Sequence, residues 1–123
     1  MIFIIDDDQS MQRAFLLLLR AAGFDAKAFS SAQEFLTYSR ISDGDCLILD
    51  IRMPGMNGFE LMEKLISKRS SMPIICITAF DDVKSRERAR ELGASAYFTK
   101  PVDDQALIDT INWVIQSEKK IKT

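Results

Sequence analysis

The sequence predicts an α/β domain built on a five-stranded parallel sheet with helices on both faces. Short apolar runs alternate five times with longer amphipathic stretches, which is the pattern of repeated strand–helix units. The runs are apolar at successive positions, as expected for strands that are buried on both faces. The length of 123 residues suits one compact domain.

The predicted strands are the five apolar runs. They span residues 1–5, 25–29, 46–49, 74–77 and 96–99. The second run is the least apolar of the five. The third follows the turn Ser42-Asp43-Gly44-Asp45, and Pro73 opens the fourth.

The predicted helices follow the strands one by one. They span residues 10–22, 31–39, 58–68 and 82–92, with a last helix that begins after Asp103 or Asp104. Gly23 and Gly93 stop the first and fourth helices, and the short polar residues at the starts are candidate caps. These caps are Asp8, Ser30 or Ser31, and Asp81 or Asp82.

Apolar residues at helical spacing predict the inward face of each helix. They are Met11, Phe15, Leu18 and Ala22, then Phe35, then Phe59, Met62 and Leu65 or Ile66, then Leu107, Ile111, Val114 and Ile115. The fourth helix is different, because its middle, residues 84–88, is nearly all polar. We expect few contacts to hold this helix and its local stability to be low.

Composition excludes several function classes. The net charge is −2 and no basic stripe is present, which argues against direct contact with nucleic acid. The chain contains no histidine, so it cannot form a Ser-His-Asp triad or a histidine metal site. Cys46 and Cys76 lie inside apolar runs, and we expect both to be reduced thiols in the core.

Membrane insertion is not expected. The longest apolar run, residues 15–19, is too short to span a bilayer, and the acidic residues 6–8 interrupt the apolar start that a signal peptide would need. The sequence therefore predicts a cytoplasmic location and no membrane contact.

Functional groups follow four of the five predicted strands. They are Asp6-Asp7-Asp8, Asp50, Thr78-Ala79 and Lys100-Pro101. Ligands collect at the carboxyl ends of strands in a parallel sheet, so we expect these groups to converge. Clustered carboxylates repel one another, and Mg²⁺ relieves that repulsion and prefers oxygen ligands. A carboxylate nucleophile, a metal ion and a lysine suffice to form an aspartyl-phosphate.

These motifs resemble the receiver domain of two-component response regulators over essentially the whole chain. The matching segments are Ile4-Ile5-Asp6-Asp7-Asp8, Leu47 to Gly58 (Leu-Ile-Leu-Asp-Ile-Arg-Met-Pro-Gly-Met-Asn-Gly), Ile75-Cys76-Ile77-Thr78-Ala79 and Gly93 to Pro101. The wording Asp50-Ile51-Arg52-Met53-Pro54-Gly55 and the triple aspartate are most similar to the branch that carries a C-terminal helix-turn-helix output domain. The resemblance implies a flavodoxin-like fold with strand order 2-1-3-4-5.

The resemblance also implies a role for each site residue. Asp50 would accept the phosphoryl group. Asp6, Asp7, Asp50 and the main-chain carbonyl of Arg52 would hold Mg²⁺ (or Mn²⁺). Lys100, Thr78 and the amide of Ala79 would contact the phosphoryl oxygens, and Tyr97 would turn inward behind Thr78 as part of the switch. The Lys100-Pro101 bond would be cis.

The expected function is that of a phosphorylated signalling switch rather than an enzyme, with only phosphoryl transfer to Asp50 and autodephosphorylation as its own chemistry. The surface of the fourth helix, fifth strand and fifth helix would control an output, here transcription. The expected partners are a sensor histidine kinase, a second copy of the chain after phosphorylation, and a DNA-binding output domain beyond this chain. We expect the receiver to span residues 1–118, with 119–123 as a polar tail or the start of a linker.

Two alternatives and one further hypothesis remain. The first alternative is an interaction module that works without phosphorylation; intact Asp6, Asp7, Asp50, Thr78 and Lys100 argue against it. The second is an aspartate-dependent phosphatase, which would need an acid/base aspartate where Arg52 stands. Arg52 and Phe80 flank the path of an attacking water, and the hypothesis is that Phe80 screens the aspartyl-phosphate and that Arg52 pairs with a nearby acidic residue.

Overall fold

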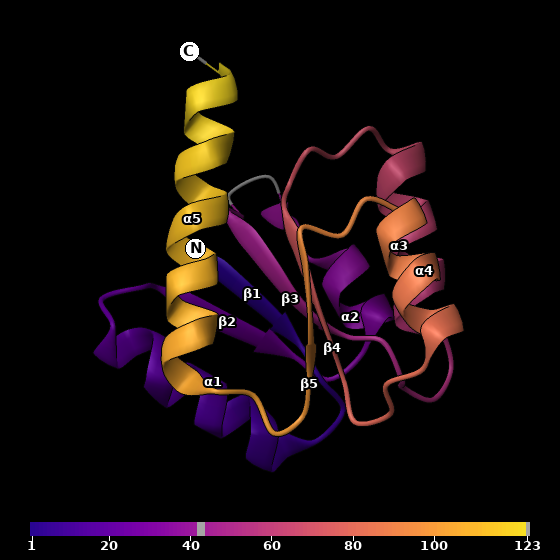
Figure 1. Cartoon of the computed structure of the whole chain (residues 1–123), viewed down its shortest axis with the longest axis horizontal. Helices are drawn as coiled ribbons and strands as arrows, with labels where there is room; N and C mark the ends of the chain where they lie inside the picture. Colours follow the sequence, from indigo (N-terminus) through magenta and orange to yellow (C-terminus); the bar gives the residue numbers. More distant parts are fainter. Residues whose placement is uncertain (42–43, 123) are drawn as a thin grey trace.

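A parallel sheet in the order β2-β1-β3-β4-β5 forms the centre of the protein (Figure 1). The computed structural model describes residues 1–41 and 44–122, and side chains to residue 117. The strands are β1 (Ile2–Ile5), β2 (Ala26–Phe29), β3 (Cys46–Asp50), β4 (Ile74–Thr78) and β5 (Ala96–Thr99). The predicted fold class and strand order are confirmed.

In the described part of the chain, five α-helices connect and follow the strands. They are α1 (Gln9–Ala21), α2 (Ala32–Thr37), α3 (Gly58–Ser67), α4 (Val83–Glu91) and α5 (Asp104–Lys122). Helix α2 ends two residues earlier than predicted, because Tyr38 already has an extended backbone with ψ of 126°. Two residues of the predicted turn, Ser42 and Asp43, lie outside the described residues. Helix α5 continues to Lys122 through the predicted tail, and the boundary at residue 118 stays a prediction.

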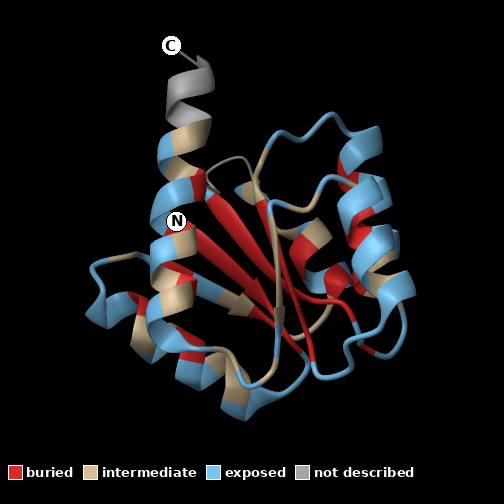
Figure 2. Cartoon of the chain, in the orientation of Figure 1, coloured by how far each residue is buried: buried red, intermediate tan, exposed pale blue. Residues whose placement is uncertain are grey.

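The sheet separates two hydrophobic cores, because successive strand residues point to opposite faces. Phe3 and Ile5 of β1 pack in the core under α2, α3 and α4, whereas Ile2 and Ile4 pack in the core under α1 and α5. Strands β1, β3 and β4 are buried along their whole length, while the outer faces of the helices are exposed (Figure 2).

The inward faces of two helices differ slightly from the prediction. In α1 the buried residues are Phe15 and Leu19, and Ala22 is exposed because it lies at the C-cap, outside the helical stripe. In α3 the buried stripe is Gly58, Leu61, Met62 and Leu65, which follows the i, i+3, i+4, i+7 spacing. Ile66 is therefore exposed, and Leu61 takes the inward position.

Short polar side chains begin the helices, as predicted for α1, α2, α4 and α5; the cap of α3 was not predicted. Asp8 accepts hydrogen bonds from the amides of Ser10 and Met11 at the start of α1. The other caps are Ser31 for α2, Asn57 for α3, Asp82 for α4 and Asp103 for α5. Each side chain satisfies an amide that has no partner within the helix.

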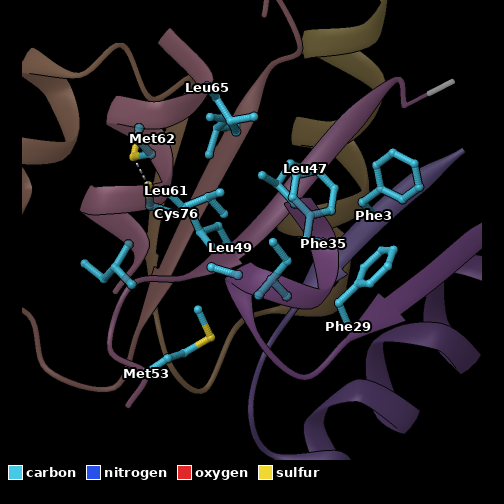
Figure 3. Close-up of a cluster of buried hydrophobic side chains, with 14 of the residues drawn as sticks. Phe3, Phe29, Phe35, Leu47, Leu49, Met53, Leu61, Met62, Leu65 and Cys76 are labelled. Carbon is cyan, nitrogen blue, oxygen red and sulfur yellow. Dashed lines mark hydrogen bonds between the residues drawn. The ribbon is translucent and has the colours of Figure 1, made fainter. Parts of the chain in front are cut away.

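An aromatic cluster fills one end of the larger core. Phe3 packs edge-on against Phe29, Phe35 and Tyr38 with ring centroids 5.4–5.9 Å apart (Figure 3 labels the three phenylalanines). At the other end, the Cys76 thiol lies 3.7 Å from the Met62 sulfur. The predicted free, buried state of Cys76 and Cys46 is confirmed. No helix in the described part of the chain is long and apolar enough to span a membrane.

Candidate functional site

Four strands deliver polar side chains to the carboxyl edge of the sheet, at the bottom of Figure 1. Asp6 follows β1, Asp50 is the last residue of β3, and Thr78 is the last residue of β4. Lys100 follows β5, and its Nζ lies 3.0 Å from Asp6 Oδ2 and 3.2 Å from Asp50 Oδ2. One ammonium group therefore bridges two carboxylates from neighbouring strands.

Main-chain contacts fix Asp6 from both sides. Its amide donates to the Phe29 carbonyl at the end of β2 (3.1 Å), and its main-chain carbonyl accepts from the side-chain amide of Gln12 (2.7 Å). Its carboxylate accepts the amide of Asp8 (2.9 Å) and the ammonium of Lys100. Asp6 is only 1% exposed, so these partners replace the water it has lost.

Asp50 is held by the loop that follows it. The amide of Arg52 donates to Asp50 Oδ1 (3.0 Å). The loop returns closely to the strand at Gly58, where an added Cβ would lie 2.6 Å from the Ile51 Cα. Only glycine permits that approach without a backbone shift, so Gly58 lets α3 start directly beside the site.

Three carboxylates form a cluster that could hold a metal ion. One oxygen each from Asp6, Asp7 and Asp50 lies within 4.8 Å of the others. At that distance two ionised carboxylates repel by about 3 kcal/mol at an effective dielectric of 20. All the donors are hard oxygens and Asp7 is exposed to solvent, which fits Mg²⁺ and the water molecules it retains. The main-chain amide of Arg52 contacts Asp50, and the role of the Arg52 carbonyl as a metal ligand stays a prediction.

Burial and neighbouring charges raise the pKa values of Asp50 and Lys100. Burial raises the pKa of Asp50, and the nearby Asp6 carboxylate adds to the effect, while the Arg52 amide and Lys100 oppose it. Burial alone would lower the pKa of Lys100, but its contacts with Asp6 and Asp50 outweigh burial and raise it. Lys100 therefore stays protonated and supplies a fixed positive charge beside the two carboxylates.

Thr78 is fully buried, and its hydroxyl is held by the loop after β4. Its Oγ1 donates to the Phe80 carbonyl and accepts from the Phe80 amide, both at 3.1 Å. The hydroxyl would have to leave these bonds to reach a group on Asp50. Ala79, between them, is exposed, so the buried region ends at Thr78.

Tyr97 on β5 is partly buried and packs against the larger core. Its hydroxyl is enclosed and has no hydrogen-bond partner among the described residues, and the Arg86 guanidinium lies 5.5 Å from the ring centroid. Burial raises the pKa of Tyr97, with Asp81 and Asp82 adding to the shift.

Arg52 and Phe80 meet at the rim of the site. The Arg52 guanidinium lies 5.3 Å from the Phe80 ring centroid, and its Nη2 lies 3.0 Å from Asp82 Oδ2. The predicted pairing of Arg52 with an acidic residue is confirmed. The structure also confirms the predicted cis bond between Lys100 and Pro101.

Comparison with known proteins identifies the family. The family model for the response regulator receiver domain matches residues 2–112 of this chain. The chain belongs to the response regulator receiver domain family. Receiver domains are signalling domains rather than classical enzymes; their general behaviour is phosphorylation on an aspartate, with Mg²⁺ bound in an acidic pocket.

Several relatives show how much of the chain this family likeness covers. The receiver domain is 36% identical over 123 residues to the transcriptional regulatory protein FixJ of Bradyrhizobium diazoefficiens, covering 99% of this chain and 60% of FixJ. It is 34% identical over 119 residues to nodulation protein W of the same organism, covering 97% of this chain and 52% of that protein. The receiver domain thus spans about half the length of the curated relatives it matches.

Solved structures agree with the fold. The response regulator StyR has a TM-score of 0.89 and 40% identity, covering 98% of this chain and 61% of StyR. A response regulator receiver protein from Burkholderia phymatum has a TM-score of 0.80 and 40% identity, covering 94% of each chain.

Sequence reasoning found the charged residues of the receiver site but missed Gln12. Gln12 contacts the Asp6 carbonyl from α1, six residues away in sequence. Its only sequence signal is a polar residue beside Met11, next to the inward stripe of that helix.

Proposed function

We propose that this receiver domain accepts a phosphoryl group on Asp50 from a partner histidine kinase and transmits the change to an output. The observation that carries the proposal is the place of Asp50 at the end of the central strand β3. It lies between Asp6 on the β1 side and Thr78 on the β4 side, and it is paired with Lys100 from β5.

The position of Asp50 distinguishes it from the other acidic residues of the site. Asp7 is exposed and makes no ion pair with Lys100. Asp6 follows β1, which lies one strand further than β3 from the Thr78 hydroxyl. Asp50 alone has an acidic neighbour on one side and a hydroxyl on the other, which is the arrangement that suits a phosphoryl acceptor.

The reaction moves one phosphoryl group between two proteins. The bond from a phosphohistidine nitrogen to phosphorus breaks, that nitrogen keeps the electron pair, and a bond from an Asp50 carboxylate oxygen to phosphorus forms. The phosphohistidine must lie outside this sequence, because its 123 residues contain no histidine. In this proposal Lys100, Thr78 and the Ala79 amide take the phosphoryl oxygens.

The acidic residues fit the divalent ion that receiver domains bind. Asp6, Asp7, Asp50 and the main-chain carbonyl of Arg52 would hold Mg²⁺ (or Mn²⁺). The bound ion supplies positive charge for the carboxylates and the phosphoryl oxygens during transfer. The close carboxylate oxygens of Asp6, Asp7 and Asp50 support this assignment.

The proposed output surface consists of α4, β5 and α5. A phosphoryl group adds about 1.5 to 2 negative charges, and Thr78 can satisfy them only by leaving Phe80. Helix α4 has one buried residue, Ala89, so little apolar contact resists its displacement. Tyr97 on β5 lies beside that helix, under Arg86.

Transcription is the proposed output. FixJ is a transcriptional regulatory protein, and this chain covers 60% of its length. We therefore propose a DNA-binding output domain beyond this chain and pairing of two receivers after phosphorylation.

The test is the intact mass of the protein after incubation with a small-molecule phosphodonor. A single phosphoryl adduct that requires Mg²⁺ and is absent from Asp50→Asn supports the proposal. Absence of the adduct in the folded wild-type protein, with both the small donor and a kinase, would favour an interaction module that works without phosphate.

A further inference from the structure

Gln12 joins three segments around the acidic cluster. From the second turn of α1, its Nε2 lies 2.7 Å from the main-chain carbonyl oxygen of Asp6 and 3.0 Å from the Ser30 hydroxyl. A carbonyl oxygen only accepts hydrogen bonds, so the nitrogen end of the Gln12 amide must face it. The contact therefore has one orientation.

The bonded carbonyl belongs to the peptide between Asp6 and Asp7. The Asp6 amide on the other side is already fixed by the Phe29 carbonyl (3.1 Å). Gln12 thus completes the main-chain hydrogen bonds at the point where β1 ends and the acidic residues begin. Ser30, which follows β2, links this support to the neighbouring strand.

Asp7 depends on that peptide more than Asp6 does. The Asp6 carboxylate is held by the Asp8 amide and by Lys100. No described residue makes a hydrogen bond or ion pair with the Asp7 carboxylate, which is exposed. Its direction is therefore set by its own backbone.

We propose that Gln12 is a positioning residue for the divalent cation: it fixes the Asp6–Asp7 peptide and so aims Asp7 at the cluster. The inference rests on the proposed function, because it assumes that Asp6, Asp7 and Asp50 bind Mg²⁺. Groups that hold metal ligands in place commonly change metal affinity by about tenfold or more when they are removed.

The test is calorimetric titration of the unphosphorylated protein with Mg²⁺. Gln12→Met keeps the length of the side chain and removes the donor, and we expect the Kd for Mg²⁺ to rise about tenfold. Ser30→Ala leaves the bond to Asp6 and should raise the Kd by a smaller factor. It also provides a second test if Gln12→Met does not fold.

Gln105→Met is the matched control. Gln105 is exposed on α5, and its side-chain amide donates to Asp109 Oδ1 at 2.8 Å. The substitution removes a comparable hydrogen bond outside the acidic cluster, so the Kd of this variant for Mg²⁺ should equal that of the wild type. The phosphorylation rate gives a second readout: in Gln12→Met the Mg²⁺ concentration for half-maximal rate should rise, and the rate at saturating Mg²⁺ should stay the same.

The outcomes separate the two proposals. If the Kd for Mg²⁺ is unchanged in folded Gln12→Met and in Ser30→Ala, the positioning role of Gln12 is wrong, although the proposed metal site is not contradicted. A rate that stays low in Gln12→Met at saturating Mg²⁺ also contradicts a positioning role. Failure of the wild type itself to bind Mg²⁺ contradicts the proposed metal site, and the inference about Gln12 falls with it.

Discussion

Arg52 and Asp82 form a salt bridge, with 3.0 Å between Nη2 and Oδ2, that joins the loop after β3 to the start of α4. Asp82 is also the N-cap of α4 and accepts the Ser85 amide at 2.7 Å. Arg52 lies two residues after Asp50. The bridge is therefore a direct polar connection between the proposed phosphoacceptor loop and the helix of the proposed output surface.

The first prediction concerns the strength of this bridge. Both side chains are about half exposed to solvent, so we expect the coupling energy in the unphosphorylated protein to be favourable but small. A double-mutant cycle of Arg52→Met and Asp82→Asn in urea unfolding measures it, and asparagine keeps the helix cap. Additive effects of the two substitutions would show that the bridge contributes nothing.

The second prediction is that phosphorylation weakens the bridge, because the phosphoryl charge attracts Arg52 away from Asp82. Hydrogen exchange of the amides at the start of α4 should speed up after phosphorylation. Arg52→Met should show faster exchange there without phosphate. Equal exchange in the unphosphorylated wild type and in Arg52→Met would contradict this route.

The third prediction is that Phe80 slows loss of the phosphoryl group. Its ring is 66% exposed at the rim of the site and stacks with Arg52. Phe80→Ala should increase the dephosphorylation rate about threefold, which corresponds to less than 1 kcal/mol of barrier. Val83→Ala, which shortens an exposed side chain at the start of α4, should leave the rate unchanged. A wild-type rate in Phe80→Ala would reject screening.

The fourth prediction is that Tyr97→Phe stabilises the unphosphorylated protein. Among the described residues, the buried Tyr97 hydroxyl has no hydrogen-bond partner, so its removal leaves none of them unsatisfied. The free energy of unfolding should rise by about 1 kcal/mol. Tyr38→Phe is the control and should give no gain, because the Tyr38 hydroxyl is not among the buried unpartnered groups. A loss of stability in Tyr97→Phe would mean that the hydroxyl has a partner in solution.

The fifth prediction concerns pH and the two buried thiols. Burial raises the pKa of Cys46 and of Cys76 from 9.0 to about 12. The unfolded chain loses these protons first as pH rises, so their contribution to stability is complete below pH 9 and declines as pH rises toward 12. Urea unfolding at pH 8 and pH 10 should show this decline. The decrease in the free energy of unfolding between pH 8 and pH 10 should be smaller in Cys46→Ala than in the wild type. An equal decrease would contradict the role of the Cys46 thiol.

The fold was predictable because apolar runs mark the strands, with only β2 interrupted by a charged residue, and capping residues mark the starts of the helices. The site was predictable for a related reason: the carboxyl ends of parallel strands share one edge, so Asp6, Asp50 and Lys100 had to meet. Arg52 was expected to find an acidic partner, but only the structure identifies Asp82, which is thirty positions away.

Contacts that leave no periodic pattern in the sequence were not predictable. The bonds from Gln12 to the Asp6 carbonyl and from the Thr78 hydroxyl to Phe80 join side chains to main-chain groups, and their geometry exists only in the folded chain. The buried positions of Leu19 and Leu61 were missed for a simpler reason. Several apolar residues in each helix satisfy the apolar pattern, and the neighbouring sheet decides which of them faces inward.

The central claim is that Asp50, rather than Asp6 or Asp7, carries the phosphoryl group. Borohydride reduction of the phosphorylated protein converts an aspartyl-phosphate to homoserine, and peptide mass mapping then locates the converted residue. The account predicts conversion at position 50 alone, and only in protein phosphorylated in the presence of Mg²⁺. Conversion at position 6 or 7, or none in protein that carries the adduct, would contradict it.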